Sequence, residues 1–104
     1  MVHHIDHIEA DLDLLVAAAE TARLTAGRRD AGAVVAFTGL CRDESGRLAA
    51  LELEHYPGMA EAEIRRVSEA AMVRFGLIAL TAIHRYGRIL PGENIVLVVA
   101  ASPH

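Results

Sequence analysis

The chain has 104 residues and a formal net charge of −4, from 14 acidic and 10 basic side chains. This length suits one domain over residues 1–104, and a content of 53% apolar and 23% charged residues is typical of a globular protein. The modest acidity argues against nucleic acid or an anionic membrane as the main partner. All ten basic residues are arginines, so the chain contains no lysine.

The sequence carries no signal for a membrane span or for export. Its longest strictly apolar run, Ile95–Ala101, is far shorter than the roughly 18 residues of a membrane helix. The first residues lack a basic segment followed by an apolar one, which a secretory signal requires. Cys41 is the single cysteine, which excludes an internal disulfide and a cysteine-rich zinc site. We therefore expect a cytoplasmic protein.

The first half of the chain predicts a strand, a helix and two further strands. Residues 2–9 carry a weak strand signal, and the alanine-rich segment 14–24, preceded by two aspartates, predicts a helix that ends at Gly27. Residues 32–39 form an apolar run between glycines, which predicts a strand buried on both faces or nearly so. Leucine and glutamate then alternate over residues 51–54, which predicts a half-buried strand.

The second half predicts a helix and two strands. Apolar residues recur at helical spacing from near Met59 to Phe75, and Gly76 ends the helix. A strand is expected over residues 78–86, and the almost wholly apolar segment 94–101 predicts a central strand. The order β-α-β-β-α-β-β indicates an α+β fold in which the helices pack on one face of a mostly antiparallel sheet.

Two motifs have a chemical and a structural interpretation, and the structural one is favoured in each. The glycines of residues 87–92 have phosphate-loop spacing, but Glu93-Asn94 follow in place of lysine and serine or threonine, so a β-turn is favoured. His3 and His7 would suit a metal on one face of a helix. No further ligand pattern supports them, so we expect an edge strand and no metal site.

Arg42 is the strongest candidate from the residues alone. It follows the predicted strand 32–39 at a turn, where loops carry binding sites, and a guanidinium group suits phosphate or carboxylate. The residues leave open whether Arg42 binds a ligand or is a surface arginine. Cys41 is either a nucleophile favoured by Arg42 or a small loop hydrophobe, and the second interpretation is favoured. His55 and His84 lie within strand patterns and are interpreted as packed, hydrogen-bonded residues.

Several short segments match one known family in chain order. They are Gly32–Gly39 followed by Arg42, Leu53–Met59, Ile83–Gly87, Pro91–Glu93 and Ser102–His104. Together they resemble the family of the large, catalytic subunit of molybdopterin synthase. The resemblance covers residues 32–104, whereas the preceding residues match only in pattern. It implies a hammerhead-like α+β domain without a metal or cofactor.

This resemblance implies a sulfur-transfer activity in molybdenum cofactor biosynthesis. The family's large subunit forms a homodimer, and each copy binds a small ubiquitin-like sulfur-carrier subunit. The carrier's C-terminal Gly-Gly thiocarboxylate enters a pocket of the large subunit. Sulfur then passes to cyclic pyranopterin monophosphate, giving molybdopterin. The large subunits and carriers together form a heterotetramer.

The resemblance also implies roles for individual residues. Arg42 and His104 are expected to be catalytic and to bind substrate, and Phe37, Leu40 and Cys41 are expected to line the substrate site. The family's catalytic lysines lie beyond the position of His104, so the resemblance implies a chain that lacks its C-terminal portion. The alternatives are a non-catalytic, truncated member that binds the carrier or dimerises, and a small anion-binding domain.

Overall fold

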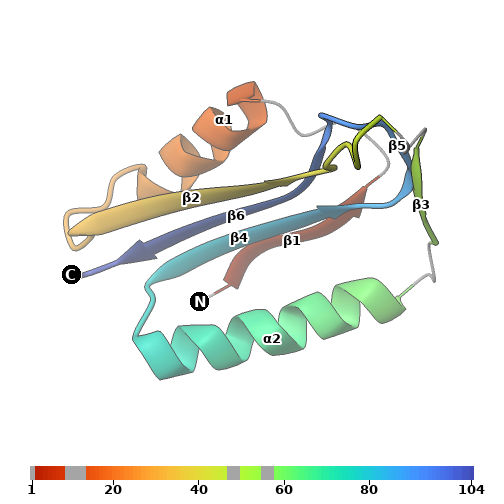
Figure 1. Cartoon of the computed structure of the whole chain (residues 1–104). Coiled ribbons are helices and arrows are strands. Elements are labelled where there is room, and N and C mark those ends of the chain that lie inside the picture. Colours follow the sequence, from red (N-terminus) through yellow and green to blue (C-terminus); the bar gives the residue numbers. More distant parts are fainter. Residues whose placement is uncertain (1, 9–13, 47–49, 55–57) are drawn as a thin grey trace.

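The structure is a computed structural model that describes residues 2–8, 14–46, 50–54 and 58–104. Two helices flank a four-stranded sheet, and a two-stranded ribbon stands at one end of it (Figure 1). The elements are β1 (Val2–Ile8), α1 (Leu14–Thr25), β2 (Ala33–Leu40), β3 (Leu51–Leu53), α2 (Met59–Phe75), β4 (Ala79–Arg85), β5 (Gly87–Ile89) and β6 (Asn94–Ser102). Neither described helix is long and apolar enough to cross a bilayer.

The main sheet has the strand order β1-β4-β6-β2. β1 runs parallel to β4, whereas β6 pairs antiparallel with both of its neighbours, β4 and β2. The expectations of an α+β fold, a mostly antiparallel sheet and a central strand at residues 94–101 are therefore confirmed. Both predicted helices are also present, and the second ends at Gly76, whose left-handed φ of 63° suits glycine.

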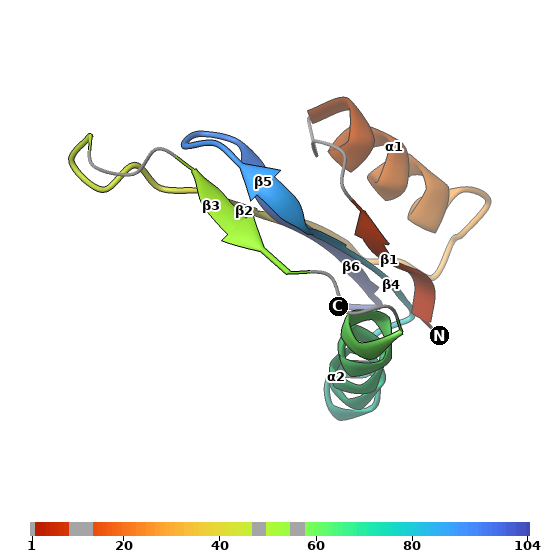
Figure 2. The same ribbon diagram turned by 90° about the vertical axis from the view of Figure 1, so that its right-hand side faces the viewer.

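The expectation that both helices pack on one face of the sheet is wrong. Leu24 of α1 belongs to a core cluster with Ile83, whereas Met72 of α2 packs with Leu80 and Ala82. Because successive residues of a strand point to opposite faces, these contacts place α1 and α2 on opposite faces of β4 (Figures 1 and 2). The physical reason is that β4 is apolar on both faces and needs cover on both.

The prediction of a doubly buried strand at residues 32–39 is also wrong. β2 is an edge strand whose partner in the sheet is β6. The side chains of Val35 and Phe37 are 65% and 60% exposed. An apolar run signals hydrophobic surface, but it does not show whether another element covers that surface.

One strand was missed in the segment that the sequence assigns to a turn. Residues 87–89 form β5, which pairs antiparallel with β3 in a separate two-stranded ribbon. The turn follows it at residues 90–93, where the Glu93 N–H donates to the carbonyl of Leu90 at 3.0 Å. The predicted strand at 51–54 is confirmed as β3, and His55 lies outside the described residues.

Candidate functional site

Arg42 lies in the loop that follows β2, at the end of the sheet where the β3–β5 ribbon stands (Figure 1). Its side chain is 85% exposed, and its guanidinium is 3.9 Å from the carboxylate of Glu44. Residues 42–45 line a shallow polar depression. A loose ion pair between exposed groups contributes little, so an anion can replace Glu44 at small cost.

The shape of this loop comes from two consecutive left-handed residues. Ser45 has a φ of 57° and Gly46 a φ of 74°. The Gly46 N–H donates to the carboxylate of Asp43 at 3.0 Å, which closes the turn. Such aspartate-led turns satisfy the backbone of a loop without a strand partner. The loop therefore presents Arg42 to solvent.

Cys41 is held between the loop and the core. Its side chain is 3% exposed, and its sulfur is 4.0 Å from the carbonyl oxygen of Ile89. Two backbone hydrogen bonds join Cys41 to the turn at residues 90–93. The Cys41 N–H donates to the Glu93 carbonyl at 2.8 Å, and the Gly92 N–H donates to the Cys41 carbonyl at 2.7 Å. This burial supports the interpretation of Cys41 as a small loop hydrophobe. Leu40, its neighbour, is 55% exposed.

His104 lies at the other end of the same pair of strands. β2 and β6 pair so that Ala33 lies opposite Ser102 and Leu40 opposite Asn94. At about 3.3 Å per residue, the length of β2 separates Arg42 from His104 by roughly 25 Å. Within one chain the structure therefore does not bring the two expected catalytic residues together.

The end that carries His104 is packed closely against Gly32. The Gly32 N–H donates to the carbonyl of Ser102 at 2.8 Å, and the hydroxyl of Ser102 donates to the carbonyl of His104 at 2.6 Å. A Cβ atom added at Gly32 would lie 2.1 Å from the carbonyl oxygen of Pro103. Glycine is thus required there because another backbone approaches it closely.

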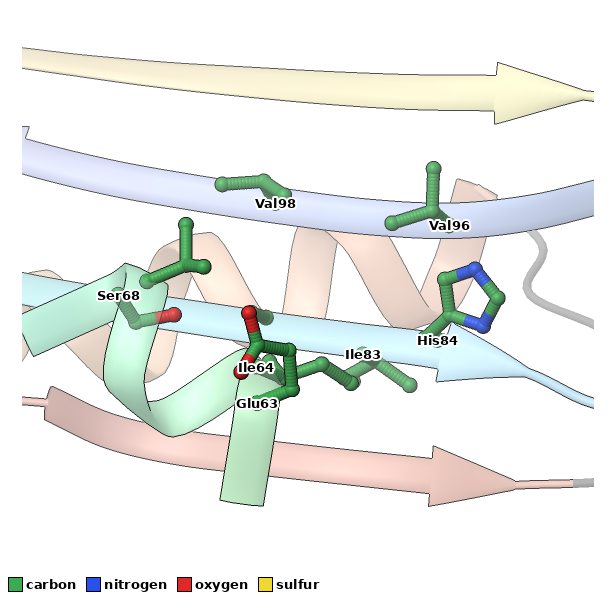
Figure 3. A pocket seen from close by; sticks show the side chains of 9 residues that line it. Glu63, Ile64, Ser68, Ile83, His84, Val96 and Val98 are labelled. Atoms are coloured by element: carbon green, nitrogen blue, oxygen red, sulfur yellow. The ribbon is translucent and has the colours of Figure 1, made fainter. Parts of the chain in front are cut away.

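An apolar groove that the sequence analysis did not locate runs between α2 and the sheet (Figure 3). Its volume is about 270 Å³, and valines of β6 form one wall while α2 forms the other. The lining residues are Glu63, Ile64, Val67, Ser68, Ala82, Ile83, His84, Val96 and Val98. The signal that could have found it is the apolar character of both faces of residues 94–101, since one of those faces lacks full cover.

Two of the residues that line the groove, Glu63 and His84, are titratable. Glu63 is hydrogen-bonded by Arg66 one turn away, and this bond together with the positive charge holds the pKa of the Glu63 carboxyl below its usual range. Among the described residues, no three His, Cys, Asp or Glu side chains gather in a way that could hold a metal ion. His3 and His7 lie on β1, an edge strand as expected, where residues four apart are separated by about 13 Å.

Fold and loop together define an α+β domain with a solvent-facing arginine at the end of an edge strand. Comparison with known proteins shows to which family this domain belongs. Residues 9–104 match the MoaE protein family, so the chain belongs to that family. The match includes the Arg42 loop, the apolar groove and the 102–104 segment.

Individual relatives agree with the family assignment. The chain is 70% identical over 87 residues to a protein of Mesorhizobium japonicum named molybdopterin synthase catalytic subunit. That alignment covers 84% of this chain and 55% of the relative, so the chain spans about half the length of the curated relatives it matches.

Solved structures show the same fold. A molybdopterin biosynthesis MoaE protein from Burkholderia ambifaria superposes with a TM-score of 0.82 at 38% identity, covering 97% of this chain and 65% of the other. Molybdopterin synthase from Staphylococcus aureus superposes with a TM-score of 0.75 at 27% identity, covering 94% of this chain and 69% of the other. The family predicted from the sequence motifs is therefore confirmed.

Proposed function

We propose that the protein acts as the large subunit of molybdopterin synthase. In this role it transfers sulfur from a thiocarboxylated small carrier subunit to cyclic pyranopterin monophosphate, forming molybdopterin. The observation that carries the proposal is the match to the MoaE family over residues 9–104, which includes the Arg42 loop. The name of the M. japonicum relative supports the same activity. The proposed compartment is the cytoplasm, because a single buried cysteine is typical of a reducing environment.

Arg42 is the proposed anchor for the substrate phosphate. Its guanidinium is exposed and carries five N–H donors in a planar arrangement that matches phosphate oxygens. Phe37 and Leu40 on the adjoining strand are more than half exposed, so their apolar side chains are available to contact the pterin rings. Cys41 contributes through its backbone, because its thiol is buried.

The proposed role of His104 is to orient the substrate or to transfer a proton. His104 follows the last residue of β6, which lies beside the start of β2, whereas Arg42 follows the end of β2. One chain therefore cannot supply both residues to one site. A second copy resolves this difficulty. We propose a homodimer in which Arg42 of one copy and His104 of the other serve the same site.

The geometry of β2 suggests how such a dimer forms. A two-fold, antiparallel pairing of two β2 edges centred on Ala36 sets Val35 against Phe37 of the second copy. The same register sets Leu40 against Gly32 of the second copy. Since Gly32 packs against Pro103, the Arg42 loop then lies beside the 102–104 segment of the second copy. The pairing also covers exposed apolar side chains of an edge strand, a surface that favours association.

The activity is tested with Arg42→Ala and a matched control, Arg65→Ala. Arg65 is also exposed and pairs with Glu69 at 3.8 Å, but it lies on α2. Turnover is measured with thiocarboxylated carrier and cyclic pyranopterin monophosphate, and substrate affinity by calorimetry. Because a charge-assisted hydrogen bond contributes roughly 1.5–3 kcal/mol, Arg42→Ala is expected to lower turnover about ten- to a hundredfold in a protein that extends through the family's catalytic lysines.

The control and the thermal melts separate the possible outcomes. Arg65→Ala is expected to leave turnover unchanged, and neither variant is expected to lower the melting temperature measurably. Equal turnover of Arg42→Ala and the original chain would refute Arg42 as an anchor. Carrier binding without any sulfur transfer by the original chain would instead favour the non-catalytic, carrier-binding module.

A further inference from the structure

The backbone of Cys41 is the point at which the Arg42 loop is attached to the rest of the fold. Both its N–H and its carbonyl are hydrogen-bonded to the turn at residues 90–93, at 2.8 and 2.7 Å. The Arg42 side chain itself is 85% exposed, and its ion pair with Glu44 is loose, at 3.9 Å. The position of Arg42 therefore depends on how firmly the 90–93 turn is held.

Glu93 holds that turn through its side chain as well as its backbone. Its carboxylate accepts a hydrogen bond from the Leu90 N–H at 2.6 Å, and its N–H donates to the Leu90 carbonyl at 3.0 Å. The same carboxylate oxygen is 3.6 Å from the guanidinium of Arg85. Arg85 also donates to the carbonyl of Arg88 at 3.3 Å.

The Arg85–Glu93 pair differs from the other ion pairs of this region in its burial. The side chain of Arg85, at the end of β4, is 8% exposed, and that of Glu93 is 30% exposed. By contrast, the Arg88–Glu52 pair on the β3–β5 ribbon has the same 3.6 Å separation, but both its side chains are about two-thirds exposed. A partly buried pair is screened less by solvent and restricts its groups more.

We propose that Glu93 and Arg85 are positioning residues for the Arg42 loop. Neither touches the substrate. Arg85 fixes the carboxylate of Glu93, Glu93 fixes the 90–93 turn, and the turn fixes Cys41 on both sides, directly before Arg42. Because the backbone that carries Arg42 is already fixed by these contacts, Arg42 loses less conformational entropy when it binds phosphate. The role rests on the proposed function of Arg42 as the phosphate anchor.

The first test uses Cys41 as a reporter, because it is the single cysteine of the chain. The residue is only 3% exposed, so a disulfide reagent reacts only when the contact with the turn opens. Glu93→Gln is expected to speed labelling several-fold, and Glu93→Ala about tenfold or more, because alanine also removes the acceptor for Leu90. Glu52→Gln is the control and is expected to leave the rate within about twofold.

Urea separates local opening from global unfolding in this experiment. A labelling rate of the Glu93 variants that does not change at low urea indicates that the turn opens locally, as proposed. A rate that rises with urea in step with global unfolding would overturn the proposal. An unchanged labelling rate in both Glu93 variants would also overturn it.

The second test links the turn to the ligand through a double-mutant cycle on the affinity for cyclic pyranopterin monophosphate. Glu93→Gln is expected to weaken binding about three- to tenfold when Arg42 is present and to have no further effect in Arg42→Ala. Additive losses would show that Glu93 acts elsewhere and would refute the positioning role. If Arg42→Ala alone leaves the affinity unchanged, the proposed anchor fails and the positioning role fails with it, whereas the labelling experiment still reports on the turn.

Discussion

The two faces of β6 differ although both are apolar. On the face toward α1, Leu97 and Val99 are 1% and 0% exposed and belong to one continuous core cluster. On the face toward α2, Val96 and Val98 are only half-buried and form a wall of the apolar groove (Figure 3). One strand thus has a closed face and an open face.

The difference comes from where the helices lie. α1 packs across β6 and β4, whereas α2 packs on β1 and β4 and leaves β6 and β2 largely uncovered (Figure 2). The closed face supplies most of the burial that stabilises the fold. The open face, continuous with the exposed Val35 and Phe37 of β2, is where apolar surface remains available for association.

The largest expected effect is on the closed face. Leu97→Ala removes a fully buried side chain from the α1 cluster, and such substitutions lower the free energy of unfolding by about 2–5 kcal/mol. Urea unfolding followed by circular dichroism measures the loss. A change below about 1 kcal/mol would contradict the closed packing of this face.

A sharper comparison uses two neighbouring valines on opposite faces of β6. Val99→Ala removes buried methyl groups and is expected to lower the free energy of unfolding by about 1.5–2 kcal/mol. Val98→Ala, the matched substitution on the open face, is expected to cost less than half of that value. Equal losses at the two positions would show that the α2 face is closed in solution, by a second copy or another partner.

A substitution of Phe37 tests the apolar surface that is continuous with the open face of β6. Because its side chain is 60% exposed, Phe37→Ser is expected to change the free energy of unfolding by less than about 1 kcal/mol, against 3–5 kcal/mol for a buried phenylalanine. If β2 edges pair in the proposed homodimer, the same variant weakens self-association in sedimentation experiments. Thr38→Ser, at the next exposed position of β2, is the control and is expected to leave both quantities unchanged. A dimer of undiminished affinity in Phe37→Ser would exclude the β2 edge.

The smallest expected effect concerns Glu63 at the rim of the groove. Arg66 lowers the pKa of Glu63 in the folded protein, so the unfolded state binds the proton more tightly. The stabilisation is therefore present above the ordinary glutamate pKa and is lost as the pH falls through the lowered one. Unfolding measured at low salt at pH 7 and pH 3 is expected to show a slightly smaller pH dependence in Glu63→Gln. A larger pH dependence in the variant would contradict this sign.

Local patterns predicted most of the individual elements. The alternation of leucine and glutamate at residues 51–54 gave β3, and the helical spacing that ends at Gly76 gave α2. These signals are local because side chains three or four residues apart share a helix face and alternate residues share a strand face. β5 was missed because it is only three residues long and because its partner, β3, is remote in the sequence.

The family was predicted from short motifs, whereas the role of each site residue stays a prediction. Five short segments between residues 32 and 104 together identified the family, because residue types in a fixed order are a property of the sequence alone. The two backbone hydrogen bonds that hold Cys41 against the 90–93 turn could not be predicted from the motifs, because they join residues some fifty positions apart in the chain. Glu93 closes that turn.

The sequence by itself determined the α+β class, the helices, the central position of β6 and the family. The tertiary structure alone decided that the helices take opposite faces, that β2 lies at an edge, and that Arg42 and His104 stand at opposite ends of one strand pair. The physical reason is that the apolar residues of a sequence determine how much surface must be buried. Which element covers that surface depends on packing between segments that are remote in the sequence.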